Sequence, residues 1–303
     1  MQISRRHFLK TAAAIGGSTL AGSLVAARPA QASAATIIDR PDGYAMLTDT
    51  TRCVGCRRCE AACNRVNKLP APKSSFEDPS VFEETRRTTA EAYTVVNRYE
   101  NLQWEKPVFR KVQCMHCAEP ACASACLVGA LKKTEEGSVV WDEKLCMGCR
   151  YCMTACPFYV PAFEYFDAGS PAIRKCTMCY QRTAKGIAPA CAEACPVEAT
   201  VFGKRNDLLR IARERIAGQP GKYVDHIYGE SEAGGTDWLY LAGVSFEQLG
   251  LPGNVGTTPF PELTKDFLSM VPLVLIVWPA LLGGFYAWTK TRQQAIRREN
   301  TEH

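Results

Sequence analysis

The stretch Cys146-Met-Gly-Cys149-Arg-Tyr-Cys152-Met-Thr-Ala-Cys156-Pro157 decides how this chain of 303 residues can be interpreted. Its four cysteines follow the spacing C-x2-C-x2-C-x3-C and are closed by a proline. Three thiolates on one tight loop can reach three corners of a [4Fe–4S] cube, and in two-cluster ferredoxins the fourth cysteine ligates the other cluster. The stretch therefore predicts an iron–sulfur loop and a partner loop elsewhere in the chain.

Three further stretches carry four cysteines each. The first loop runs from Cys53 to Cys63 and repeats the spacing of the opening stretch. The second, from Cys114 to Cys126, has four residues where the first has two, and the fourth, from Cys176 to Cys195, has eleven residues between its second and third cysteines. All sixteen cysteines fall into these four loops, and every loop ends in C-x3-C. This regularity predicts metal clusters.

Other uses of cysteine explain the pattern less well. Three cysteines at x2, x2 spacing fit a tetrahedral structural zinc poorly. A c-type haem needs C-x-x-C-H, and no C-x2-C pair in this chain is followed by histidine. A disulfide-bonded, exported structural protein is the alternative from another class, but a disulfide framework gives no reason for the repeated spacing. His116 lies inside the second loop, where four cysteines are already present, and is expected to be an exposed loop residue rather than a ligand.

Length and charge set further limits. A chain of 303 residues allows one large or two small domains. The formal net charge is +5 with cysteines counted as neutral. Four cubes with thiolate ligands would add about −8. Residues 1–32 hold four cations and no acid, so the processed chain with its clusters would carry about −7. The basic composition is therefore no argument for a nucleic-acid partner.

The N-terminus has the form of a twin-arginine export signal. Arg5-Arg6 precedes an Ala/Gly-rich apolar run from Thr11 to Ala27, and Ala30-Gln31-Ala32 provides an A-x-A cleavage site. An ordinary apolar N-terminal helix is the alternative. Export by this route carries folded proteins, which agrees with clusters that are inserted where thiols stay reduced.

The C-terminal region predicts a membrane anchor. Residues 267–288 are about 22 mostly apolar residues, or about 33 Å of helix, enough for a bilayer core of roughly 30 Å. A buried core helix is the alternative, and Pro272 and Pro279 favour it somewhat. Four cations follow the segment, at Lys290, Arg292, Arg297 and Arg298. By the positive-inside rule the C-terminus is expected in the cytoplasm and the cluster domain in the periplasm.

The predicted fold class is α+β, with tandem bacterial-ferredoxin-like cluster domains and a single C-terminal transmembrane helix. The expected parts are a signal peptide (1–32), a four-cluster domain (44–205) with an insertion (66–112), a C-terminal extension (206–252), a linker (253–266), the transmembrane helix (267–288) and a cytoplasmic tail (289–303). Strands are expected at 93–96, 106–112 and 199–203, with a hairpin formed by 130–132 and 138–141. A helix capped by Asn206 or Asp207 should end at Gly218. The run Trp238-Leu-Tyr240-Leu reads as a strand and as a candidate contact for a partner subunit.

Together these features make residues 44–252 resemble the four-cluster, ferredoxin-like iron–sulfur (β) subunits of respiratory membrane oxidoreductases. Later segments, His226-Ile-Tyr-Gly229 and the run from Gly234 to Tyr240, add to the likeness. Its own export signal and C-terminal anchor look most like the iron–sulfur subunit of periplasmic [NiFe] hydrogenase, and the β subunit of formate dehydrogenase is the alternative. His226 is expected to be structural.

The resemblance implies four [4Fe–4S] clusters with crosswise ligands, each cube taking three cysteines from one loop and the last from its mate. The implied sets are Cys53, Cys56, Cys59 and Cys195; Cys176, Cys179, Cys191 and Cys63; Cys114, Cys117, Cys122 and Cys156; and Cys146, Cys149, Cys152 and Cys126. Arg57, Arg58 and Arg150 could raise a cluster's potential, or they could be solvated loop edges.

The implied function is that of a non-catalytic electron-transfer subunit in the cell inner membrane. It would relay electrons between a periplasmic catalytic subunit, a [NiFe] hydrogenase or a molybdopterin enzyme, and an integral membrane quinone-reactive subunit of the cytochrome b or polytopic haem-free type. No nucleophile with a paired base and no phosphate-binding glycine loop stands out in the sequence. A self-contained quinone-linked reductase is the rival among enzymes.

Overall fold

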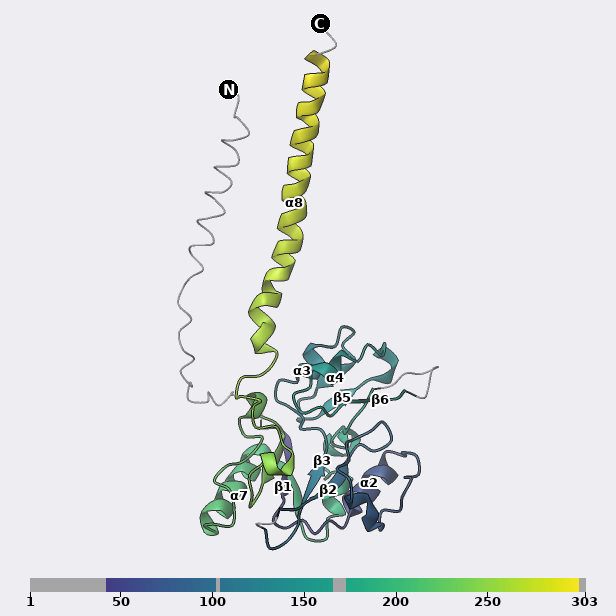
Figure 1. Cartoon of the computed structure of the whole chain (residues 1–303), viewed down its shortest axis with the longest axis vertical. Coiled ribbons are helices and arrows are strands. Elements are labelled where there is room, and N and C mark those ends of the chain that lie inside the picture. The colour runs from purple at the N-terminus through teal and green to yellow at the C-terminus, as the bar shows by residue number, and fades with distance from the viewer. Residues whose placement is uncertain (1–41, 102–103, 166–172, 300–303) are drawn as a thin grey trace. The chain divides into compact units, whose positions relative to one another are not determined.

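The computed structural model describes residues 42–101, 104–165 and 173–299, with side chains up to residue 297. The predicted signal peptide lies outside these residues. The cysteine-rich part combines short helices with short strands, as the α+β class requires (Figure 1). Loops occupy much of it. A fold that metal ligands hold together needs a smaller apolar core, and such ligands can lie on turns.

A three-stranded sheet forms the frame, in the order β8-β1-β9. The central strand β1 (Tyr44–Asp49) pairs antiparallel with β8 (Thr200–Lys204) and parallel with β9 (Trp238–Leu241). Both neighbours come from beyond the last cysteine loop. β1 is buried on both faces, which explains its nearly continuous apolar run.

The two faces of this sheet pack against different parts of the chain. Ala45, Leu47 and Leu239 point toward helix α7 (Arg205–Gly218) and form one apolar cluster with its buried side chains. Met46 and Trp238 point the other way, into a cluster that contains cysteines of three of the four loops. The alternation of strand side chains therefore separates a purely apolar layer from a cysteine-containing layer.

Three small hairpins complete the strand structure. The first two bear out the expected strands to within a few residues, and the third was not expected. They are β2 (Val95–Tyr99) with β3 (Val108–Val112), β4 (Leu131–Lys133) with β5 (Val139–Trp141), and β6 (Ala162–Phe163) with β7 (Ile173–Arg174). Helix α2 (Arg58–Val66) packs on α6 (Ala190–Glu193), and α3 (Ala121–Ser124) on α4 (Tyr151–Ala155). A single-turn helix, α5 (Tyr180–Thr183), follows Cys179.

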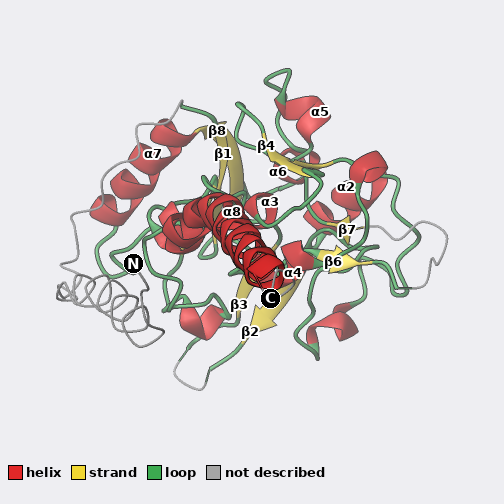
Figure 2. Cartoon of the chain, turned by 90° about the horizontal axis from the view of Figure 1, so that it is seen from above, coloured by secondary structure: helices red, strands yellow, loops and turns green. Residues whose placement is uncertain are grey.

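Helix α7 (Arg205–Gly218) ends where expected but begins differently. The prediction that Asn206 or Asp207 caps it is wrong, because the helix starts at Arg205 with Lys204 in the cap position and no capping side chain from that residue. Instead, Asp42 accepts a hydrogen bond from the Asn206 amide at 3.1 Å. The cap thus comes from a residue two positions before β1, the strand on which α7 packs (Figure 2).

Trp238 and Tyr240 are 0% and 1% exposed, inside the chain's own core. The expectation that this strand contacts a partner subunit is therefore wrong. The Trp238 Nε1–H donates to Thr48 Oγ1 at 2.9 Å, and the Tyr240 hydroxyl donates to the Lys111 carbonyl at 2.7 Å. The Trp238 bond lies within the sheet, and the Tyr240 bond ties the sheet to β3.

The last helix, α8 (Glu262–Glu299), is continuous through Pro272 and Pro279. It begins five residues before the apolar segment, where Glu262 suits the positive end of the helix dipole. It is long and apolar enough to cross a membrane, and its apolar window is not buried within the described chain. The core-helix alternative is therefore not supported, and a single span is the better interpretation.

Candidate metal centre

The four cysteine loops share one backbone feature. The residue two places after the first cysteine has a positive φ in every loop, as seen at Gly55, His116, Gly148 and Met178. This left-handed residue turns the chain back over the sulfur. The amide of His116 then lies 3.5 Å from Cys114 Sγ, and that of Met178 lies 3.3 Å from Cys176 Sγ. Amides that point at sulfur stabilise negative charge there.

The third cysteine of each loop lies on a short helix. Cys59, Cys122, Cys152 and Cys191 belong to α2, α3, α4 and α6 in turn. Since α2 packs on α6 and α3 on α4, loop 1 meets loop 4 and loop 2 meets loop 3. Strand register has the same effect: Thr48 pairs with Thr200, just before loop 1 and just after loop 4.

We divide the sixteen cysteines into four groups. Group 1 contains Cys53, Cys56, Cys59 and Cys195; group 2 contains Cys63, Cys176, Cys179 and Cys191; group 3 contains Cys114, Cys117, Cys122 and Cys156; and group 4 contains Cys126, Cys146, Cys149 and Cys152. These are the four sets that the resemblance implies.

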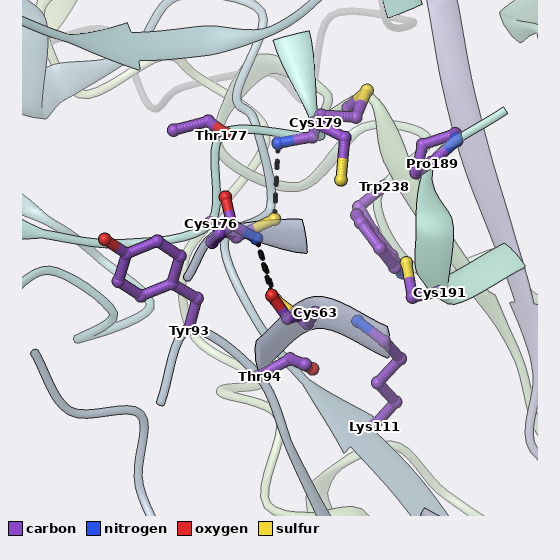
Figure 3. A pocket seen from close by; sticks show the side chains of 12 residues that line it. Cys63, Tyr93, Thr94, Lys111, Cys176, Thr177, Cys179, Pro189, Cys191 and Trp238 are labelled. Atoms are coloured by element: carbon purple, nitrogen blue, oxygen red, sulfur yellow. Dashed lines mark hydrogen bonds between the residues drawn. The ribbon is translucent and has the colours of Figure 1, made fainter. Parts of the chain in front are cut away.

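Groups 2 and 4 each line a cavity of their own. All four cysteines of group 2 surround one cavity together with Lys111, Tyr93 and Trp238 (Figure 3). All four cysteines of group 4 surround another, with Trp141 and Ile173. Figure 3 shows the sulfurs of group 2 directed toward a common space.

In groups 1 and 3, thiols from two different loops lie close enough to affect one another's pKa. Burial raises the pKa of Cys53 to about 11, and charge on Cys195 of the fourth loop adds to this effect. Burial also raises the pKa of Cys117, with Cys114 and Cys156 adding to it. Each group therefore contains a cysteine from a second loop.

The four groups follow one another in space. Burial raises the pKa of Cys59 in group 1, and Cys191 of group 2 contributes. Burial raises the pKa of Cys176 to about 12, and Cys114 of group 3 contributes. The same holds for Cys122 of group 3, whose pKa of about 12 reflects burial and Cys152 of group 4. The order is thus 1, 2, 3, 4.

This donor set fits iron–sulfur clusters. Buried thiols that repel one another's charge stay protonated on their own, whereas a coordinating metal deprotonates them outright. All sixteen cysteines are free of disulfides. Among the described residues, no three His, Cys, Asp or Glu side chains converge closely enough to hold a single metal ion. Sulfurs that surround a larger space suit a polynuclear cluster better than zinc.

Several charged side chains near the loops differ from expectation. Arg57 is 4% exposed, and its guanidinium donates to Glu60 and to the carbonyls of Ser75 and Asp78. Arg57 therefore belongs to a structural ion pair and is not a solvated loop residue. Arg58 and Arg150 are exposed, and Arg150 lies over the Phe163 ring.

His116 is fully buried, so the expectation of an exposed loop residue is wrong. Its Nδ1 accepts a hydrogen bond from the Val139 amide at 2.9 Å, which fixes loop 2 against the β4–β5 hairpin. His226 is structural, as expected, because its Nε2 contacts Glu232 Oε1 at 2.5 Å. Two buried lysines, Lys111 and Lys175, were not predicted from the sequence, because a charged side chain is ordinarily expected at the surface.

The fold and the cysteine groups define a multi-cluster, ferredoxin-like protein. A family model described as a 4Fe-4S dicluster domain matches residues 106–205. The hydrogenase-2 operon protein HybA of Escherichia coli O157:H7 is 35% identical over 280 residues, 82% of this chain and 84% of that protein.

Two further relatives have shorter matches. The nitrate-inducible formate dehydrogenase iron–sulfur subunit of Escherichia coli K12 is 32% identical over 65% of this chain and 67% of its own length. The probable anaerobic dimethyl sulfoxide reductase chain YnfG of the same strain is 38% identical over 54% of this chain and 75% of its own length. The chain belongs to the iron–sulfur electron-transfer subunits of oxidoreductases. It relays electrons through [4Fe–4S] clusters within such a complex.

Proposed function

We propose that the chain holds four [4Fe–4S] clusters, one in each cysteine group, and that electrons pass along them in the order 1, 2, 3, 4 or its reverse. The observation that carries this proposal is the division of sixteen free cysteines into four groups of four that adjoin in a single series. Such clusters supply one-electron redox chemistry over a wide range of potentials when bound.

The chain's own residues prepare this chemistry in two ways. Amides donate to cysteine sulfur, as between Ala130 and Cys126 at 3.2 Å and between Ala199 and Cys195 at 3.2 Å. Hydrogen bonds to sulfur and exclusion of solvent are two of the means by which a protein sets cluster potentials. The sheet and the paired short helices hold successive groups side by side.

The two ends of the series suit two partners. Cys56 in group 1 and Cys149 in group 4 are the exposed cysteines, so the outermost groups are the ones open at the surface. One end would face a catalytic subunit and the other an integral membrane quinone-reactive subunit. Relatives named as a hydrogenase operon protein and as a formate dehydrogenase iron–sulfur subunit support a catalytic partner.

We place the chain in the cell inner membrane, with the cluster domain in the periplasm and the C-terminus in the cytoplasm. Support comes from the twin-arginine pattern at the N-terminus, from α8 as a single span, and from the cations that follow its apolar part. Protease added to intact spheroplasts should cleave the cluster domain and spare a C-terminal epitope tag. Protection of the cluster domain would contradict this orientation.

The composition of the complex is the decisive test. Anaerobic purification of the full chain in detergent, with its associated subunits, should give about 16 iron per chain and a broad absorbance near about 400 nm. Nickel without molybdenum or tungsten would identify a hydrogenase partner, and molybdenum or tungsten would identify a formate dehydrogenase or related enzyme. A colourless preparation without free thiols would contradict the cluster proposal and favour a disulfide-bonded protein.

A further inference from the structure

Two lysines lie in the protein interior beside the cysteine groups. Lys111 and Lys175 are each 2% exposed, although lysine is almost never fully buried unless it is paired. Among the described ion pairs, neither ammonium has a carboxylate partner. Lys133, which is partly buried nearby, differs in this respect because it binds Asp237 at 2.5 Å.

Lys111 stands between groups 1 and 2. It lines the group 2 cavity, and Figure 3 shows its ammonium directed toward Cys63 and Cys191. Its Nζ donates to Gln113 Oε1 at 3.2 Å and lies 4.4 Å from the centroid of the Trp238 ring. Phe109, on the same face of β3, packs directly on Gly55 in the loop of group 1.

Lys175 stands between groups 2 and 3. Its Nζ donates to the carbonyl of Cys176, a member of group 2, at 3.1 Å, and also to the carbonyl of Val139. The amide of the same Val139 donates to His116 in the loop of group 3. One residue of β5 therefore connects this ammonium to the neighbouring loop.

A buried ammonium without an anion is expensive. A cube with four thiolate ligands carries roughly −2 when oxidised, and it becomes more negative when an electron is added. A cation held at short range in a medium of low dielectric therefore stabilises the reduced form more than the oxidised form. The cubes would supply the anions that the two lysines lack.

We propose that Lys111 and Lys175 are internal counter-cations of the relay, Lys111 serving groups 1 and 2 and Lys175 serving groups 2 and 3. Both lysines act on the clusters through their charge, and neither is a cluster ligand. Group 2 has a buried lysine on both sides, whereas group 4 has none among the described residues, so an electron is held most favourably in the middle of the series. This inference rests on the proposed assignment of one cluster to each group.

The test compares the full chain, purified anaerobically with its partners, with the variants Lys111→Met and Lys175→Met. Lys132→Met, which changes an exposed lysine on β4, is the matched control. The readout is the reduction potential of each cluster, from EPR spectra recorded during redox titration. Cys56→Ser and Cys149→Ser assign the signals of the two end clusters.

We expect Lys111→Met to shift the potentials of clusters 1 and 2 to more negative values, and Lys175→Met to do so for clusters 2 and 3. Cluster 4 should keep its potential in both variants, and the control should change none. Lys111→Arg, which retains the charge, should restore the potentials. Unchanged potentials, or an equal shift of all four, would overturn the inference.

Iron content separates this inference from the proposed function. The wild-type chain is measured first, and a failure to bind about 16 iron would contradict the cluster assignment itself. If Lys111→Met loses iron while Lys111→Arg keeps it, the charge is required for assembly and the inference is supported. If both variants lose iron equally, the shape of lysine matters and its charge does not, and the inference is wrong.

Discussion

Cysteine groups 2 and 4 contain the same ligand type on similar loops, but their surroundings are opposite. In group 2, Cys63, Cys176 and Cys191 are at most 8% exposed, and the cavity is closed by Trp238 and Lys111. Group 4 has only one buried cysteine and includes an exposed one. The cysteine spacing determines that a loop forms, and the elements behind the loop determine how far its cluster is from solvent.

The difference comes from the supporting strands. Group 2 lies against the three-stranded sheet, whose aromatic residues fill the space behind it. Group 4 is supported by two short hairpins, β4–β5 and β6–β7. Apolar side chains around it, such as Leu127 and Met147, are 72% and 60% exposed. Group 4 is therefore suited to contact with another protein, and group 2 to storage of charge inside the chain.

Loss of one cysteine ligand should give the largest difference between groups 2 and 4. Cys176→Ser removes a buried ligand of group 2, which adjoins groups 1 and 3, so we expect loss of more than the roughly four irons of a single cube. Cys149→Ser at the exposed end should cost about four irons or fewer. Iron per chain and EPR spectra of anaerobically purified protein measure both, and equal losses would show that burial does not distinguish the groups.

Removal of the tryptophan behind each group should have the next largest effect. Trp238→Ala deletes a fully buried side chain and its hydrogen bond to Thr48, which should destabilise the fold by about 3–5 kcal/mol. Trp141→Ala, behind group 4, should cost less because this side chain is only partly buried. Anaerobic thermal unfolding monitored by circular dichroism gives the order, and a larger loss for Trp141→Ala would contradict it.

Replacement of glycine by alanine should have different effects in the loop of group 1 and in the segment that follows Cys126 of group 4. Gly55 has φ 71°, and an added Cβ would lie 2.5 Å from the Phe109 ring. Gly129, which follows Cys126 of group 4, has φ 63° with no atom within 4 Å of such a Cβ. Gly55→Ala should therefore cost more than the about 1–2 kcal/mol of backbone strain expected for Gly129→Ala. Unfolding midpoints and iron content compare the two variants.

The smallest expected effect is a pH dependence of the stability that the pair of His226 and Glu232 contributes. The hydrogen bond to Glu232 raises the pKa of His226 above its ordinary 6.5. Burial alone would raise the pKa of Glu232, but His226 and the Gly229 amide lower it below 4.5. The stabilisation is therefore complete between about pH 4.5 and 6.5, and it is lost as the pH rises through the raised value for histidine.

His226→Gln tests this pair. Because His226 is well exposed, the variant should lose less than about 1 kcal/mol. The difference in unfolding midpoint between wild type and variant should shrink from pH 6 toward pH 8. A constant difference over this range would mean that the ion pair does not contribute.

The local elements were predictable from the sequence because their signals are local. The C-x2-C spacing marks the loops, and β-branched and aromatic residues mark strands such as Val95–Tyr99 and Val139–Trp141. The grouping of the cysteines across loops was available only through family resemblance, because it depends on which helices and strands pair at long range. The structure supplies that pairing through β1 and β8.

Burial of polar residues could not be predicted in the same way. Lys111, Lys175 and His116 carry side chains that are ordinarily exposed, and nothing in their neighbouring residues signals an interior position. His116 and Lys175 bind the amide and carbonyl of Val139 on β5, and Lys111 donates to Gln113 Oε1. Asp42, which caps α7 from more than 160 positions away, was missed for the same reason.

The position of β1 has a consequence for how the protein is made. Its two neighbours, β8 and β9, are synthesised about 150 and 190 residues later, as the contacts from Thr48 to Thr200 and to Trp238 show. The strand emerges from the ribosome before every cysteine loop and must wait for its partners until the last loop has followed. Long-range pairing of this kind forms late in folding. The sheet therefore closes only after all sixteen ligands exist, and translation cannot lock an incomplete set of them into the finished frame.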